Sequence, residues 1–328
     1  MTMPFRGLLA ELAKHWVALI GLAAVAALVI SVDPSKVEYS LRRADMGEVA
    51  LMLPVVVALY ALHGVAWSIA LRGLRLPIGV RRAIKVTLIS QAFDLVPGGD
   101  LWRVPILKAE SGSALEAGVL TAAVVFDDLV YFLVLTLGMV PAAVEVPWFR
   151  AALGAALLPQ AAIFAILLWP GLYERLAQVV GSIRLFRRFQ VQIDLLGPAF
   201  RRLVRARTVI PIVLVDALCA GLAIALFGLA LAAVHATGAS PERVSFTYAS
   251  GQVLTGLTVL PGALGLYEGM MTGMMAVQGV AVAAAAAAAL IYRLINDVLM
   301  AILGLGVALV FDRRPMKYFG RRPEVAAP

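Results

Sequence analysis

Cysteine, histidine and charged side chains are all scarce in this chain. Its one cysteine, Cys219, excludes an intramolecular disulfide, and its three histidines lack the spacing of metal ligands. Charged residues make up 15% of the sequence, against about 25% in soluble domains. Neither a Walker A motif nor a Gly-x-Ser-x-Gly element is present. The sequence therefore does not predict a soluble enzyme, and we expect no cofactor and no metal site.

Hydrophobic residues are abundant instead. They make up 62% of the 328 residues, and the mean hydropathy is +0.92. This composition predicts an all-α integral membrane protein, because a helix needs roughly 20 consecutive apolar residues to cross the bilayer. The first such run could imitate a signal peptide, but no convincing cleavage site precedes Asp33, so we expect it to be retained. The chain contains six such runs, at 16–32, 50–71, 114–140, 149–169, 208–233 and 280–311.

Two further apolar stretches, 79–109 and 244–278, are each interrupted by a Pro-Gly break. The limbs on either side of each break are short for a membrane span. We therefore predict two re-entrant helix hairpins, with a pair of short spans kinked at proline as the alternative. The breaks contain, in chain order, Pro97, Gly98 and Gly99, then Pro261, Gly262 and Gly265.

Basic residues gather in three connecting segments. They follow the second span, fill the loop 170–207 and follow the last span, whereas the other loops hold few or balanced charges. The positive-inside bias then places both termini in the cytoplasm, in a multi-pass protein of a bacterial inner membrane. The same bias, and not nucleic acid, accounts for the net charge of +8. Apolar residues among the arginines of 170–207 predict an amphipathic surface helix, with a solvated connector as the alternative.

This orientation turns the two halves of the chain in opposite directions. The first hairpin would enter from the cytoplasm, and the second from outside. Pro97 and Pro261 are 164 residues apart, and Asp128 and Arg293 are 165 apart. The sequence thus predicts an inverted repeat, a recurrent design among transporters. The two repeats and a basic cytoplasmic tail would occupy residues 1–145, 146–312 and 313–328.

Ionisable residues in the middle of apolar helices are the first candidate site residues. Asp127 and Asp128 lie in mid-span, where an ionised carboxylate costs at least ~2.5–3.5 kcal/mol. Arg293 has the matching position in the second half, beside Tyr292, so we predict that it pairs with one of these aspartates. A structural ion pair that fixes helix register is the alternative to a role in transport. Asp297, one turn later, would share the network of Arg293.

A second group of charges flanks the two breaks. Asp94, Asp100 and Arg103 frame the first break, and Glu268 follows the second. Backbone N–H groups freed at a helix start form an anion site, so we predict that these residues bind a charged headgroup at the hairpin mouths. Helix capping is the simpler role for Asp100. We expect Arg103 and Glu268 to lie near polar helix ends.

Four sequence runs also carry a family resemblance: Leu95–Arg103, Ala122–Asp127, Leu260–Glu268 and Leu290–Leu294. Over roughly residues 10–312 the chain resembles the lysylphosphatidylglycerol synthase transmembrane-region family, also called flippase-like domain proteins. That resemblance implies a lipid translocator, which occurs alone or fused to a cytosolic aminoacyl transferase or glycosyltransferase. Asp128 stands where the family usually has arginine, and no soluble domain follows residue 312, so lysyl transfer is not implied here.

Two function classes follow from these observations. The first is a translocator of a membrane lipid or a polyprenyl-phosphate-linked lipid, working by alternating access of the two hairpins. The second is a non-transporting membrane subunit that presents lipid to a separate cytosolic or membrane transferase. A carrier of a small soluble solute is a weaker third hypothesis, because the apolar surface is extensive and the polar binding groups are few.

Overall fold

The computed structural model describes residues 34–311 except 94–98, 112–114, 185 and 257–264. The part so described is built of helices, with no strand in it, and the chain is an all-α integral membrane protein. The predicted first span, 16–32, lies outside this part. By length and composition five helices can cross a membrane: α3 (Met46–Gly73), α6 (Ala117–Gly138), α8 (Pro147–Leu168), α11 (Ala206–Ala233) and the continuous helix α14–η5–α15 (Val282–Arg293, Leu294–Leu299 and Met300–Phe311). These match the other five predicted spans.

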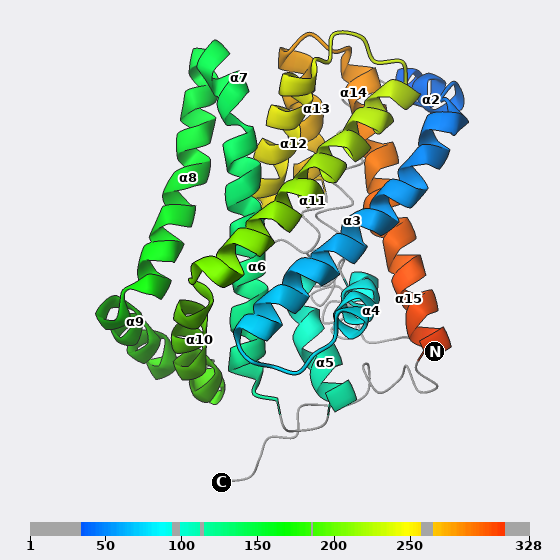
Figure 1. The fold of residues 1–328 in the computed structure, drawn as a ribbon. Coiled ribbons are helices and arrows are strands. Elements are labelled where there is room, and N and C mark those ends of the chain that lie inside the picture. The colour runs from blue at the N-terminus through cyan, green and yellow to red at the C-terminus, as the bar shows by residue number, and fades with distance from the viewer. Residues whose placement is uncertain (1–33, 94–98, 112–114, 185, 257–264, 312–328) are drawn as a thin grey trace, which may run out of the picture.

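Each interrupted stretch forms two short helical limbs. The first stretch contains α4 (Val80–Ser90) with η1 (Gln91–Phe93), then η2 (Gly99–Trp102) with α5 (Arg103–Ser111). The second contains α12 (Pro241–Gly256) and α13 (Leu266–Val277). Every limb is shorter than the ~20 residues that a span requires. In Figure 1, α4 and α5 lie toward one end of the bundle, whereas α12 and α13 reach the other end.

The second limb of each stretch begins at a glycine in the left-handed region. Gly99 has φ 40° and Gly265 has φ 78°, values that a residue without Cβ adopts without steric cost. The Pro-Gly dipeptides themselves, at 97–98 and 261–262, lie outside the described residues. In both stretches the second limb therefore begins at a glycine with a positive φ, although the two stretches differ in length.

The connecting helices close the two ends of the bundle. α9 (Pro170–Ser182), η3 (Arg187–Phe189) and α10 (Gln190–Leu203) replace the predicted single amphipathic helix. Gly118 of α6 lets α10 approach closely, because a Cβ there would lie 2.4 Å from the carbonyl oxygen of Gln192. At the opposite end in Figure 1 lie α2 (Pro34–Arg42) and α7 (Val140–Glu145).

Buried side chains form two hydrophobic clusters rather than one. One cluster surrounds α4 and α5, with Ile89, Ile106 and Trp67 among its members. The other surrounds α12, α13 and α14, and includes Phe246 and Met271. Each interrupted stretch thus has a packed core of its own, and the long helices α3, α6 and α11 contribute to both.

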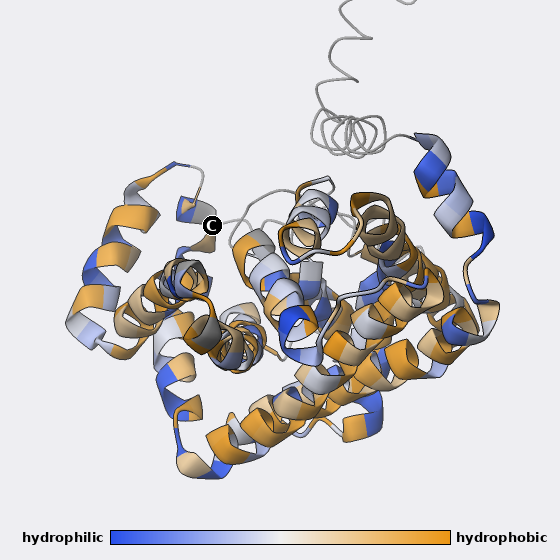
Figure 2. Cartoon of the chain, turned by 90° about the horizontal axis from the view of Figure 1, so that it is seen from above, coloured by the Kyte–Doolittle hydropathy of each residue, from blue (hydrophilic) through white to orange (hydrophobic). Residues whose placement is uncertain are grey.

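The outward faces of the long helices suit a hydrocarbon environment. Ile210, Leu214 and Leu218 follow one another at four-residue spacing on α11, and each is about 60% exposed. The long helices are mainly hydrophobic along their length in the end-on view of Figure 2. Exposed leucine and isoleucine at this spacing form a lipid-facing stripe, because apolar side chains in lipid need no burial within the protein.

The packing of α3 on α4 generates a stability prediction. A Cβ at Gly64 would lie 2.5 Å from the Cα of Ile84, and backbone cannot move aside as a side chain can. We expect Gly64→Ala to displace α4 and to lower stability by about 1–3 kcal/mol, measured by unfolding of the purified protein in mixed micelles. Gly221→Ala is the matched control, because nothing lies within 4 Å of its added Cβ. Equal stability of the two variants would contradict this packing.

Candidate functional site

The first break is followed by a buried arginine held between two carboxylates. Arg103, at the start of α5, is 1% exposed. One terminal nitrogen, Nη1, donates to Oδ2 of Asp127 on α6 at 3.2 Å, and the other, Nη2, donates to Oδ1 of Asp100 at 2.5 Å. Its guanidinium also lies 5.9 Å from the ring centroid of Trp67. The side chain therefore ties the second limb of the stretch to the next membrane span.

The second break is followed by the same arrangement with the charges exchanged. Glu268 on α13 is 1% exposed, and its Oε1 accepts from Nε of Arg293 on α14 at 2.8 Å. Its other oxygen, Oε2, accepts from the backbone N–H of Gly265 at 2.6 Å, which caps α13. Arg293 also pairs with Asp297 in the π-helical turn η5. Here the second limb of the stretch carries the acid, and the following span carries the base.

The predicted pairing of Arg293 with Asp127 or Asp128 is wrong. Each charge finds its partner inside its own half of the chain, so Asp127 pairs with Arg103 and Arg293 pairs with Glu268 and Asp297. The physical reason is proximity, because each second limb packs directly on the span that follows it and meets the charge there. Asp128 is only partly buried, and the described residues include no ion-pair partner for it.

Arg103 and Glu268 lie in the first turns of α5 and α13, near helix ends as expected. Both are almost completely buried, and each holds a limb to a span. Asp100, predicted as a helix cap, lies within η2 and binds Arg103 instead. It is the more exposed member of that cluster, with 37% of its side chain accessible. Access to Arg103 therefore lies on the side of Asp100.

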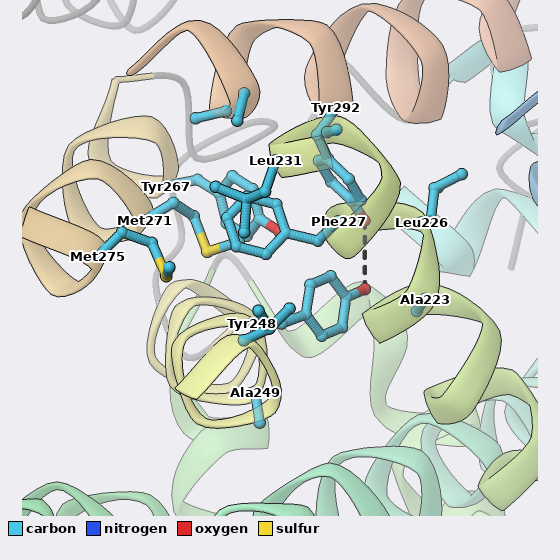
Figure 3. Close-up of a cluster of buried hydrophobic side chains, with 14 of the residues drawn as sticks. Ala223, Leu226, Phe227, Leu231, Tyr248, Ala249, Tyr267, Met271, Met275 and Tyr292 are labelled. Atoms are coloured by element: carbon cyan, nitrogen blue, oxygen red, sulfur yellow. Dashed lines mark hydrogen bonds between the residues drawn. The ribbon is translucent and has the colours of Figure 1, made fainter. Parts of the chain in front are cut away.

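Tyr292, the neighbour of Arg293, belongs to an aromatic cluster rather than to the ion pairs. Its hydroxyl donates to that of Tyr248 at 3.2 Å, and its ring packs against Tyr267 (Figure 3). Tyr267 lies in turn beneath the guanidinium of Arg293, 5.4 Å from the ring centroid. Met271 of α13 and Phe227 of α11 belong to the same hydrophobic cluster. This cluster fixes the orientation of the second hairpin limb.

A polar layer separates the two hydrophobic clusters. On α3, Leu59 belongs to one cluster and Trp67 to the other, and His63 lies between them. On α11, Ile212 and Cys219 likewise belong to different clusters, and Asp216 lies between them. On α6, Val130 belongs to one cluster and Leu135 to the other, and Asp127 and Asp128 lie just before this boundary. The charged residues therefore gather where the two cores meet.

A cavity opens at the end of the bundle where α4, α5 and α15 meet. Its volume is about 800 Å³, and basic, acidic and apolar side chains line it. Glu110 accepts from Lys85 at 2.6 Å and from Arg82 at 3.2 Å, and Arg81 lies nearby. Leu88 and the α15 residues Val307 and Phe311 form the apolar wall. The cavity therefore combines a charged rim with an apolar wall.

The structure leaves some predicted site residues undescribed and adds others that were missed. Five predicted positions lie in undescribed segments. His63, Asp216 and Cys219 were not predicted, although a lone aspartate in an apolar span is a signal that could have singled out Asp216. The undescribed positions are Asp94, Pro97, Gly98, Pro261 and Gly262.

Comparison with known proteins places this arrangement in a family. Residues 17–304 match the family described as the lysylphosphatidylglycerol synthase TM region. The chain belongs to this family. It is also 24% identical, over 326 aligned residues, to a UPF0104 membrane protein from Methanothermobacter thermautotrophicus, an alignment that covers 89% of this chain and 94% of that protein. The family match covers both ion-pair clusters, and it fits a multi-pass membrane protein.

The ion pairs predict an order of stabilities among variants. Arg103→Met leaves two carboxylates without their partner, and breaking a buried pair costs about 3–5 kcal/mol. Arg103→Met combined with Asp127→Leu should recover much of that loss. Glu268→Gln should cost less, because Arg293 keeps Asp297. Denaturant unfolding of the purified variants measures this, and strictly additive effects of the two substitutions at residues 103 and 127 would contradict the pair.

Proposed function

We propose that this protein translocates a lipid or lipid-linked precursor with an anionic headgroup across the inner membrane, without catalysing a reaction of its own. The two interrupted stretches would act as re-entrant hairpins of an inverted repeat, opening alternately to each side. The observation that carries the proposal is the charge-exchanged pair, Arg103 with Asp127 and Glu268 with Arg293, which joins each second limb to the next span.

The first support is that each cationic group already holds an internal anion. Glu110 forms ion pairs with Arg82 and Lys85. In the same way, Asp100 pairs with Arg103, and Glu268 pairs with Arg293. A phosphate can replace a carboxylate on an arginine, because both accept two parallel N–H bonds. A headgroup could thus move from one cation to the next while the displaced carboxylate reforms its pair behind it. The arginine therefore keeps an anionic partner at each step.

The second support is the cavity between α4, α5 and α15. A lipid entering from the membrane could place its acyl chains against Leu88, Val307 and Phe311, and its phosphate against Arg82 and Lys85. The C-terminal end of α3, where Arg72 lies, and the helices α4, α9 and α10 are at the same end of the bundle in Figure 1. All of them carry basic residues, so the positive-inside bias would make this the cytoplasmic end. Loading would then start from the cytoplasmic leaflet.

One observation favours the alternative of a subunit that presents lipid to a separate transferase. Residues 285–289 of α14 are all alanine and completely buried, which gives a tightly packed helix contact. A bundle closed at this contact could hold lipid at the cavity without moving it across. The reconstitution described next separates the two functions, because only a translocator exposes the headgroup in the other leaflet.

The transport proposal predicts movement of labelled anionic lipid in reconstituted vesicles. We expect the wild-type protein to expose a headgroup-labelled phosphatidylglycerol or polyprenyl phosphate to a quencher faster than protein-free vesicles do. The double variant Arg82→Ala/Lys85→Ala should lower that rate at least fivefold, because the entry cavity loses the two cations that bind Glu110. Lys108→Ala is the matched control, a lysine of α5 that does not line the cavity. A wild-type rate equal to that of empty vesicles would refute translocation.

The orientation proposal predicts the labelling of single cysteines. Cys219→Ser removes the only native cysteine, so Glu242→Cys and Arg184→Cys can be tested one at a time. Glu242 begins α12, Arg184 follows α9, and both are exposed. In intact cells we expect a membrane-impermeant maleimide to label residue 242 and not residue 184. The reverse pattern would invert the proposed topology.

A further inference from the structure

Three potential metal ligands meet in the polar layer, apart from the two ion-pair clusters. His63 comes from α3, and Asp216 and Cys219 come from α11. The two α11 residues are three apart, so they lie on one face of the helix. A ring nitrogen, a carboxylate oxygen and the thiol sulfur all lie within 4.8 Å of one another. α3 and α11 are both 28 residues long and pack against each other, which makes this a fixed meeting point.

The buried carboxylate of Asp216 lacks a direct partner in the described part of the chain. Its side chain is 0% exposed, and neither carboxylate oxygen has a hydrogen-bond partner among the described residues. Arg103 of the nearest cluster acts on Asp216 only at a distance, because its guanidinium is bound to Asp100 and Asp127. A buried carboxylate without a counter-charge is strongly unfavourable, so this group needs a bound cation or a proton.

The surroundings of Asp216 favour a cation of a particular kind. Cys219 is also 0% exposed, and the His63 ring is held edge-on against Tyr131, with 4.8 Å between centroids. Mg²⁺ and Ca²⁺ prefer ligand sets made wholly of oxygen. A set of one nitrogen, one oxygen and one sulfur suits Zn²⁺ and related borderline ions instead. A divalent ion also balances one carboxylate and one thiolate, which would leave the buried site neutral.

We propose that His63, Asp216 and Cys219 form a binding site for a divalent transition metal of the zinc class. Binding replaces the Sγ–H bond of Cys219 by a bond from sulfur to metal and the O–H bond of a protonated Asp216 by a bond from oxygen to metal, and the two released protons pass to solvent. Bond lengths of about 2.0–2.3 Å require the three donors to close slightly from their present separations. The fourth position of a tetrahedral ion stays open to water or another polar group. The ion would clamp α3 to α11 at the level where the two hydrophobic cores meet.

Cobalt provides a sharp test, because Cys219 is the only cysteine of the chain. The full-length protein, purified without a histidine tag and stripped with a chelator, is titrated with Co²⁺. We expect one equivalent to bind, with visible bands of tetrahedral cobalt and a near-ultraviolet band from sulfur to metal. That sulfur band can arise only from Cys219, so Cys219→Ser should abolish it. His63→Ala and Asp216→Asn should each weaken binding at least tenfold.

His235→Ala is the matched control, because this histidine lies beyond the end of α11, away from the site, and its loss should leave the titration unchanged. A second readout is the thermal midpoint, which Zn²⁺ should raise in the wild type and not in Cys219→Ser. Cys219→Ser changes one atom, so it keeps the test valid even if Asp216→Asn fails to fold. Absence of a sulfur band in the wild type, or unchanged binding in all three variants, would refute the site and assign a proton to Asp216.

Discussion

Neutralising charge inside an apolar helix bundle is the constraint on which the rest of this structure depends. Water does not screen charges there, so a buried arginine or carboxylate is costly unless it contacts a counter-charge directly. Arg103 and Glu268 meet that need through the span that follows each of them. The position of each short limb is therefore set by an ion pair as much as by packing. Helices too short to span a membrane can keep a defined place in the bundle in this way.

The two hydrophobic clusters divide the bundle into two separately packed regions. α3, α6 and α11 run through both hydrophobic clusters and act as a common frame, while each interrupted stretch is packed mainly within one cluster. The polar layer lies at the boundary, where the dense apolar packing of either core is interrupted. Movement of one stretch would disturb its own core and its own ion pair first. The architecture thus separates the two interrupted stretches by a layer of polar side chains.

Local sequence information accounts for the elements that were predicted correctly. Long apolar runs identify the spans, because crossing a bilayer sets both their length and their composition. The Pro-Gly dipeptides likewise identify the two interrupted stretches, because proline and glycine interrupt a helix through their own local backbone properties. Pairing between helices was harder to predict. The 165-residue offset suggested a bond from Arg293 to Asp128, whereas contact is decided by which helix packs on which. His63 and Asp216 are 153 residues apart in the chain, and no spacing rule brings them together.

The π-helical turn η5 lies between the second ion-pair cluster and the contact of α15 with α4. It places Asp297 against Arg293, and the same continuous helix then reaches α4, where an added Cβ on Gly304 would lie 2.4 Å from the carbonyl oxygen of Leu88. A π turn contains one residue more than the α-helical register accommodates. Removing that residue would turn α15 by about 100° and carry Gly304 away from α4. This continuous helix therefore contacts both halves of the chain. A single extra residue, next to the second ion pair, sets which face of α15 packs against α4.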